Sequence, residues 1–207
     1  MASHQFLQKN RRQGGYTIVE LGIALTIIAV LIISGLAGVN TLLNSSRAND
    51  QIAASGQVMA RLQSFVTNTQ ATNDFNTASG IGLGLFPAPR VNVARTEVRN
   101  VFAGAEFVVT NAFQIPAVPN VTQAIPANRS VVYTLTNIPR AVCADIATTL
   151  ANLSDTAWVD VSINAVAAAL PADGLRIRNS GAATNLANVG IRCNTGDLVG
   201  MHFILRP

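Results

Sequence analysis

The sequence predicts an α+β fold in which a long N-terminal α-helix packs on a mostly antiparallel β-sheet. Three observations support this class. Residues 21–39 form an uncharged apolar run, the residues that follow keep helical periodicity without proline, and several later segments alternate like β-strands. A long helix before a strand-rich body is the pattern of an α+β protein.

The charge of the chain is concentrated at its N-terminus. The 207 residues include 14 Lys and Arg, 10 Asp and Glu, and 49% hydrophobic residues. This composition excludes a disordered chain, which needs high charge and little apolar content. Lys9, Arg11 and Arg12 supply three of the four net positive charges, and no Lys follows them. The nearly neutral remainder lacks a basic surface for phosphate backbones, so we predict no nucleic-acid partner.

The apolar run LGIALTIIAVLIISGLAGV at 21–39 predicts one membrane-spanning helix. As a helix it is about 28 Å long, close to the hydrocarbon thickness of a bilayer. The preceding cations predict a cytoplasmic N-terminus and a translocated C-terminal body. A conventional secretory signal has its small residues after the apolar run. Cleavage at Ala37-Gly38 would fit that order and release a soluble protein, whereas Gly14-Gly15 precedes the run.

The helix is expected to continue past the membrane as an amphipathic half. Apolar residues recur at spacings of three, four and seven over 52–66, with polar residues between them. A continuous helix over 16–69 would be about 80 Å long.

The body is expected to consist mainly of strands. The β-rich segments are 106–110, 130–136, 158–164 and 198–205. A helix is expected over 141–153, with Asn137 as its cap and Pro139 in an early position. The stretch 70–105 is rich in Gly and Pro and predicts a long connection.

No pattern of residues indicates an enzyme, a cofactor or a metal. Cys143 and Cys193 are the only cysteines and fall in the translocated part, where one disulfide is expected. They and His202 are too few for a zinc site, and a catalytic Cys–His pair is the remaining alternative. The glycines of 80–84 lack the Lys-Ser/Thr of a phosphate-binding loop.

Glu20 lies directly before the uncharged run. An acid at this depth either reaches the headgroups or needs a cation beside it, because an unpaired charge is costly in an apolar layer. Cleavage after Gly15 would create an amino group four residues away, or the partner amine would come from a neighbouring subunit.

The stretch QGGYTIVELGIALTIIAVLIISG resembles the class III signal of type IV pilins and pseudopilins. The resemblance implies that a prepilin peptidase cuts between Gly15 and Tyr16 and that Tyr16 is N-methylated. It also implies that Glu20 pairs with the α-amine of Tyr16 during assembly. The basic leader residues would be Lys9, Arg11 and Arg12. Tyr16 replaces the more usual Phe or Met, and the mid-helix Pro of the type IVa branch is absent.

The ending IRCNTGDLVGMHFIL resembles the C-terminal region of type IVb pilins, in which a disulfide such as Cys143–Cys193 closes the region before the last strand. The resemblance implies a leader over 1–15, a helix over 16–69 whose part 16–39 forms the membrane span and filament core, and a globular head over 70–207. The disulfide would bound the region 143–193.

The implied function is a structural subunit, most similar to a type IVb major pilin, in a filament for adhesion, aggregation, motility or conjugation. Its partners would be copies of itself, the prepilin peptidase and an inner-membrane assembly platform. It would start in the bacterial inner membrane and end in an extracellular pilus. Alternatives are a type II secretion pseudopilin or minor pilin, and a membrane-tethered periplasmic enzyme or binding domain. Arg90, Arg95 and Arg99 are either a solvated loop face or a contact with acids of another subunit.

Overall fold

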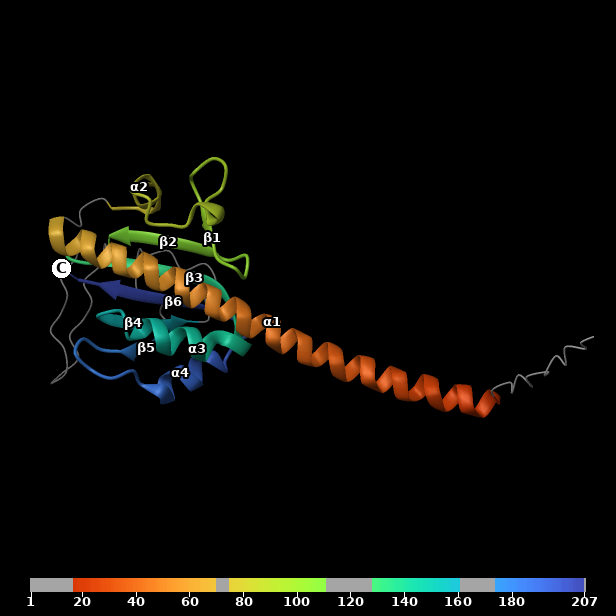
Figure 1. Cartoon of the computed structure of the whole chain (residues 1–207). Helices are drawn as coiled ribbons and strands as arrows, with labels where there is room; N and C mark the ends of the chain where they lie inside the picture. The colour runs from red at the N-terminus through yellow and green to blue at the C-terminus, as the bar shows by residue number, and fades with distance from the viewer. Residues whose placement is uncertain (1–16, 70–74, 111–127, 161–173, 207) are drawn as a thin grey trace, which may run out of the picture. The chain divides into compact units, whose positions relative to one another are not determined.

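The computed structural model describes residues 17–69, 75–110, 128–160 and 174–206 (Figure 1). The chain divides into an N-terminal unit, Met1–Leu42, and a C-terminal unit, Leu43–Pro207. Helix α1 (Ile18–Thr69) contributes its first part to the N-terminal unit and its second part to the C-terminal unit. The helix predicted over 16–69 matches α1 from Ile18 to Thr69, and the described residue Thr17 precedes the helix.

Three hydroxyl groups at the start and in the first part of α1 bond to the helix backbone itself. The Thr17 hydroxyl accepts a hydrogen bond of 3.2 Å from the backbone N–H of Glu20, as an N-cap residue does. The Thr26 hydroxyl donates to the carbonyl of Gly22 at 2.7 Å, and the Ser34 hydroxyl donates to the carbonyl of Val30 at 2.9 Å. Such back-bonding removes the need of these hydroxyls for external partners, so they interrupt the apolar surface of the segment little.

In the described part of the C-terminal unit, six strands form one antiparallel sheet with the order β1-β2-β3-β6-β4-β5. The strands are β1 (Val98–Arg99), β2 (Ala105–Thr110), β3 (Val131–Pro139), β4 (Thr156–Asp160), β5 (Leu175–Arg178) and β6 (Leu198–Leu205). The shorter elements are α2 (Thr77–Gly82), η1 (Ala88–Arg90), α3 (Arg140–Ala151) and α4 (Leu186–Cys193). The last strand, β6, thus lies in the middle of the sheet.

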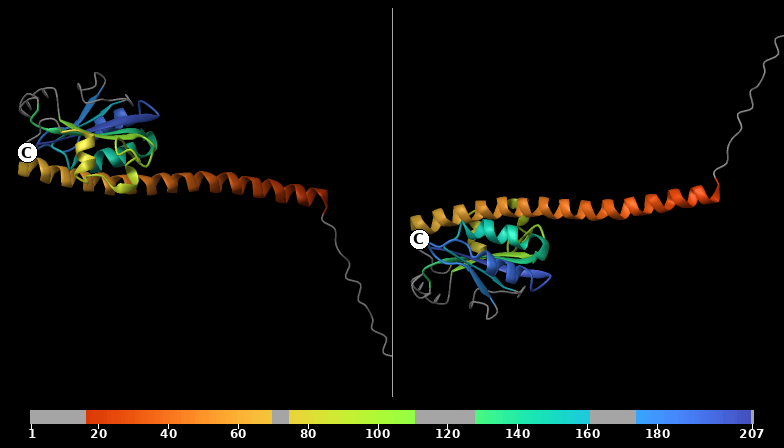
Figure 2. Two further views of the ribbon diagram at one scale, coloured as in Figure 1. Left: turned by 90° about the horizontal axis from the view of Figure 1, so that it is seen from above. Right: turned by 90° about the horizontal axis from the view of Figure 1, so that it is seen from below.

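The hydrophobic core lies between the sheet and the helices on one of its faces. Figure 2 shows the second part of α1 and helix α3 on the same side of the sheet. Leu62 of α1 and Ile146 of α3 are fully buried there, in one cluster with Tyr133 and Phe203 of the central strands. Burying each large apolar side chain contributes about 1.5–3 kcal/mol, so this layer dominates the stability of the unit.

Side chains occupy part of the sheet edge on both sides: along β2 beyond its short pairing with β1, and along β5. At one edge, the Thr77 hydroxyl accepts from the N–H of Val108 at 3.1 Å and donates to its carbonyl at 3.3 Å. At the other edge, the side-chain amide of Asn188 donates to the carbonyl of Arg176 at 2.7 Å. Groups occupied in this way are not available for pairing with strands of other chains.

The predicted α+β class, with a long helix and an antiparallel sheet, is confirmed. Strand β6 matches the predicted range 198–205, and α3 ends two residues before the predicted 153. Strand β4 begins earlier than expected and is described to Asp160, whereas 161–164 lie outside the described residues. The connection over 70–105 contains α2, η1 and β1, which were not predicted, and β5 and α4 were also missed.

The predicted cap of α3 is wrong. Asn137 does not cap the helix, because it belongs to β3, and Pro139 occupies the N-cap position without a side-chain hydrogen bond. The pairing of β3 with β6 shifts register between Leu135 and Ile138, which accommodates an extra residue as a β-bulge. The strand therefore runs directly into the helix.

Candidate functional site

The first part of α1 presents an apolar surface. Its large apolar residues from Ile18 to Leu42 are each between 50% and 90% exposed. Among the described residues, α1 is the one helix that is long and apolar enough to cross a membrane, with a mean hydropathy of 2.5 in its most apolar window. A continuous apolar surface of this kind marks contact with a membrane or with other protein surfaces.

Glu20 is the only charged residue between Ile18 and Leu42. It is exposed and lies in the first turn of α1, where the positive end of the helix dipole favours a carboxylate. Its predicted partner Tyr16 and the adjacent Gly15 lie outside the described residues, as do the leader residues Lys9, Arg11 and Arg12. The pairing of Glu20 with an α-amine stays a prediction.

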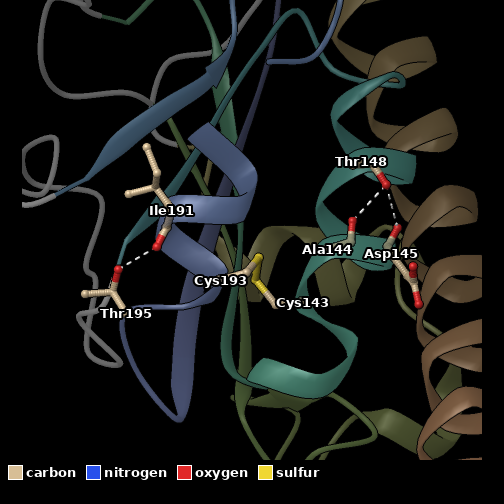
Figure 3. The surroundings of a disulfide bond; sticks show 7 residues. All are labelled: Cys143, Ala144, Asp145, Thr148, Ile191, Cys193 and Thr195. Carbon is tan, nitrogen blue, oxygen red and sulfur yellow. Dashed lines mark hydrogen bonds between the residues drawn. A yellow bond between two sulfur atoms is a disulfide. The ribbon is translucent and has the colours of Figure 1, made fainter. Parts of the chain in front are cut away.

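The predicted disulfide between Cys143 and Cys193 is present, and it joins α3 to the last residue of α4 (Figure 3). The Cα atoms of the two cysteines are 5.6 Å apart, and both side chains are buried. At each helix a threonine hydroxyl near the bond also donates to a backbone carbonyl four residues earlier. Thr148 donates to the carbonyl of Ala144 at 2.7 Å, and Thr195 donates to the carbonyl of Ile191 at 2.6 Å. Since both thiols are in the disulfide, the alternative of a catalytic Cys–His pair is excluded.

A buried polar cluster lies between α1 and the sheet, and we call it the Glu106 cluster: Gln51, Ser55, Arg90, Glu106 and Tyr133. The Glu106 carboxylate accepts from the amide of Gln51 at 2.8 Å, from Nη1 of Arg90 at 2.9 Å and from the Tyr133 hydroxyl at 3.2 Å. The Ser55 hydroxyl lies 2.9 Å from that of Tyr133 and 2.7 Å from the Gln51 amide nitrogen. The cluster therefore connects α1, η1, β2 and β3.

The environment of the cluster keeps Tyr133 protonated. Burial raises the pKa of the Tyr133 hydroxyl well above its usual 10.0, and the nearby charge of Glu106 raises it further. The Arg90 guanidinium compensates the Glu106 charge, since a buried carboxylate without a cation would be strongly destabilising. The second Arg90 nitrogen, Nη2, donates to the carbonyl of Asp50 at 3.3 Å and so holds η1 against α1.

The structure separates the three arginines that the sequence groups together. Arg90 belongs to the Glu106 cluster, with a side chain that is only 13% exposed. Arg99 is exposed and lies 3.6 Å from the carboxylate of Glu97. Nothing in the sequence identified Glu106 as the partner of Arg90. Glu106 lies 16 residues after Arg90, at the start of a predicted strand, and local spacing does not connect the two residues.

The opposite face of the sheet carries a row of side chains across its central strands. The register places Thr134, His202, Trp158 and Arg176 opposite one another in turn. The His202 ring lies 3.0 Å from the Thr134 hydroxyl through Nδ1 and 2.8 Å from Asp160 through Nε2. The Arg176 guanidinium lies 4.8 Å from the centre of the Trp158 ring, and burial lowers the pKa of Arg176.

The Thr134–His202–Asp160 contact has the connectivity of a catalytic triad but not its exposure. Thr134, His202 and Asp160 are each at most 5% exposed, so we assign the contact to packing between strands. Across the described ranges, no group of three or more His, Cys, Asp or Glu residues is placed to hold a metal ion.

Comparison with known proteins supports the fold rather than a sequence family. No family model matches the chain, and no curated protein sequence matches it. Among solved structures the chain is similar to TcpA, a type IV pilin from Vibrio cholerae El Tor biotype, with 16% identity over 75% of this chain and 98% of that chain and a TM-score of 0.48. It is also similar to the type IVb pilin from Salmonella typhi, with 11% identity over 77% of this chain and 99% of that chain and a TM-score of 0.50.

The similarity to the Salmonella typhi structure shows that this chain has the α+β fold of a type IV pilin. The resemblance predicted from the N-terminal motif and the C-terminal ending is thereby confirmed at the level of the fold. In this chain the fold consists of a long N-terminal helix and an antiparallel sheet.

Proposed function

We propose that this protein is a structural subunit of a type IV pilus, of the type IVb branch, and not an enzyme. One observation carries the proposal. A helix segment with apolar side chains exposed along its whole length, and a single acid in its first turn, leads into a disulfide-bonded unit with the pilin fold. An apolar segment of this kind needs an apolar environment both before and after assembly.

In this mechanism the same helix has two environments in succession. The bilayer holds it before assembly, and the helices of neighbouring subunits enclose it in the filament. A head-to-tail contact that does not close on itself produces a helical polymer. Residues 1–15 would be the leader, 16–69 the assembly helix with 16–39 in the membrane, and 70–207 the head with its disulfide-bounded region 143–193.

The Glu20 carboxylate would set the register of the helices. Cleavage between Gly15 and Tyr16 exposes an α-amine, which is then N-methylated and still carries a positive charge. Pairing of that amine with Glu20 of the adjacent subunit would neutralise both charges. An unpaired carboxylate in the apolar filament core would be costly, so only the correct axial register would satisfy it.

The partly occupied edges of the sheet favour assembly through helices. Thr77 occupies the edge of β2, and Asn188 occupies the edge of β5. Strand addition from another subunit would first have to displace these side chains. The apolar first part of α1 has no comparable obstruction.

The proposal includes partners and a route. The chain would be inserted in the bacterial inner membrane with its N-terminus in the cytoplasm, processed by a prepilin peptidase, and polymerised by an inner-membrane assembly platform. The product would be an extracellular homopolymer that serves in adhesion, aggregation, motility or conjugation.

The decisive experiment is an intact mass with N-terminal sequencing of protein sheared from the cell surface. We expect a chain that starts at Tyr16, is one methyl group heavier than its residues and two hydrogens lighter for the disulfide. Since no Lys follows residue 15, an amine-reactive reagent should modify such a chain at its N-terminus alone. An uncut chain confined to the membrane fraction would contradict the proposal and support a membrane-tethered periplasmic domain.

A further inference from the structure

The first charged residue after Glu20 is Arg47, and residues 21–46 between them carry no charge. As part of α1 this stretch is about 40 Å long, which matches the thickness of a bilayer with its headgroup layers. We propose that Arg47 and Asp50 bind the zwitterionic headgroup of a phosphatidylethanolamine lipid before assembly, with Arg47 on the phosphate and Asp50 on the ammonium group. The inference rests on the membrane-inserted subunit of the proposed function and names its lipid partner.

One polar turn separates the exposed apolar surface of α1 from the part of the helix that packs on the sheet. Leu43 is 49% exposed, and Ala48, which is 2% exposed, is the first residue of α1 in the hydrophobic core. Residues 44–47 between them are Asn, two Ser and Arg. This turn lies where the chain enters the C-terminal unit from the proposed membrane span. Polar and cationic side chains that flank a membrane span reach the headgroup layer.

The charged groups of Arg47 and Asp50 are available to a ligand. Both residues are exposed, and within the described part of the chain neither side chain forms an ion pair. Arg90 contacts Asp50 only through the backbone carbonyl, which accepts from Nη2 at 3.3 Å, and its Nη1 is bound to Glu106. The carboxylate of Asp50 therefore keeps its oxygens for a donor from outside the protein.

The order of the two charges along the helix matches the order of charges in the headgroup. Residues three apart share one face of a helix, and Asp50 lies about 4.5 Å farther from the membrane span than Arg47. In phosphatidylethanolamine the phosphate is joined to the glycerol, near the acyl chains, and the ammonium group lies farther out. The guanidinium donates to the phosphate oxygens, and the ammonium group donates to the carboxylate. An anionic headgroup would instead leave Asp50 without a partner beside a second negative charge.

The test is native mass spectrometry of the full-length protein in detergent micelles, titrated with phosphatidylethanolamine or with phosphatidylcholine of the same acyl chains. The two lipids share the phosphate, but the trimethylated ammonium group of phosphatidylcholine has no N–H to donate. We expect the Kd of phosphatidylethanolamine to be lower by about threefold or more, the effect of one hydrogen bond. Equal Kd values for the two lipids would overturn the proposal.

Two variants assign the contacts. Arg47→Ala should raise the Kd of both lipids by about threefold or more, because both lipids present a phosphate. Asp50→Ala should raise the Kd of phosphatidylethanolamine alone and bring it close to that of phosphatidylcholine. The matched control is Arg129→Ala, an exposed arginine just before β3, at the end of the unit where Gln63 of α1 donates to the carbonyl of Arg206. This variant should leave both Kd values unchanged.

Lipid affinities that Arg47→Ala and Asp50→Ala leave unchanged would overturn the proposal. A lower filament yield from the same variants would then assign the two residues to contact with a second copy of the chain. All variants share the leader cations, so differences between variants report the substituted residue: Lys9, Arg11 and Arg12. The measurement uses unassembled protein, so its failure is distinguishable from failure of the pilus proposal, which the mass of sheared protein tests.

Discussion

Arg90 of η1 and Glu106 of β2 form an ion pair, with Nη1 of Arg90 2.9 Å from Oε1 of Glu106. The Glu106 side chain is completely buried, and Arg90 is 13% exposed. Removing one partner of a buried ion pair lowers the stability more than replacing both partners by apolar residues, because the remaining charge stays buried away from water. The fold of the connecting segment around η1 therefore depends on this contact.

Replacing Arg90 should be strongly destabilising. We expect Arg90→Met to lower the free energy of unfolding by about 3–5 kcal/mol, since Glu106 keeps its charge in a buried site. Denaturant unfolding of the full-length protein in detergent measures the change. The control is Arg99→Met, whose exposed partner Glu97 should limit the loss to about 1 kcal/mol or less. Equal losses of unfolding free energy in Arg90→Met and Arg99→Met would contradict the view that Arg90 compensates a buried charge.

Tyr133 should make the protein sensitive to alkaline pH. Burial, with the charge of Glu106, raises the pKa of Tyr133 well above 10.0 in the folded state. Above about pH 10 the unfolded chain loses this proton and the folded chain keeps it, so stability falls by up to about 1.4 kcal/mol per pH unit. Below pH 10 both states are protonated and the stability is retained.

The pH dependence of the unfolding midpoint between about pH 9 and 11 tests this expectation. Tyr133→Phe should be less stable at neutral pH, because the Ser55 and Glu106 contacts are lost, and should show a smaller decline at high pH. A decline of the same size in the variant would assign the effect to other groups.

His202 should be required for the stability of the central strands. His202→Leu removes the ring from Oδ2 of Asp160, whose other oxygen, Oδ1, has no hydrogen-bond partner in the described part of the chain. We expect a loss of about 1–3 kcal/mol or more, the cost of a buried acceptor without a partner. The double variant with Asp160→Leu should recover part of the loss, as a double-mutant cycle would show. Additive losses would contradict a direct contact.

The Cys143–Cys193 bond should stabilise the C-terminal unit. It links residues 50 apart, for which the chain-entropy model gives about 4 kcal/mol. We expect the double variant Cys143→Ala, Cys193→Ala to unfold at lower denaturant concentration by a corresponding amount. Adding a reductant should bring the wild-type protein close to the variant and leave the variant unchanged. A wild-type unfolding midpoint that does not change when reductant is added would contradict the stabilisation by the disulfide.

Glu20 should be needed for assembly and not for folding. We expect Glu20→Ala to give a stable membrane-bound subunit but few sheared filaments, because the register contact with the neighbouring α-amine is missing. Glu97→Ala, an exposed acid of the C-terminal unit, is the matched control and should assemble normally. Filament yield relative to total subunit measures the effect, and a normal yield from Glu20→Ala would refute the pairing.

Patterns of local composition predicted the elements with strong periodicity. The uncharged run and the proline-free stretch after it predicted α1, and the alternation of residues 198–205 predicted β6 at its observed bounds. The sequence missed α2, β1 and β5 because elements of two to six residues carry too few positions for a period to emerge. Asn137 and Pro139 have the composition of a helix start, but β3 continues to Pro139, which pairs with Leu198 of β6, and Asn137 lies in the bulge before it.

The sequence by itself determined the apolar helix, the position of Glu20 and the two available cysteines, since each follows from residue type and local spacing. Only the tertiary structure decided that Arg90 pairs with Glu106, that His202 lies between Thr134 and Asp160, and that Asn137 lies in a bulge of β3. These relationships depend on which strands are neighbours. Strand order is set by burial between residues far apart in the sequence, as in the placement of β6 between β3 and β4. The local spacing of residues therefore cannot predict it.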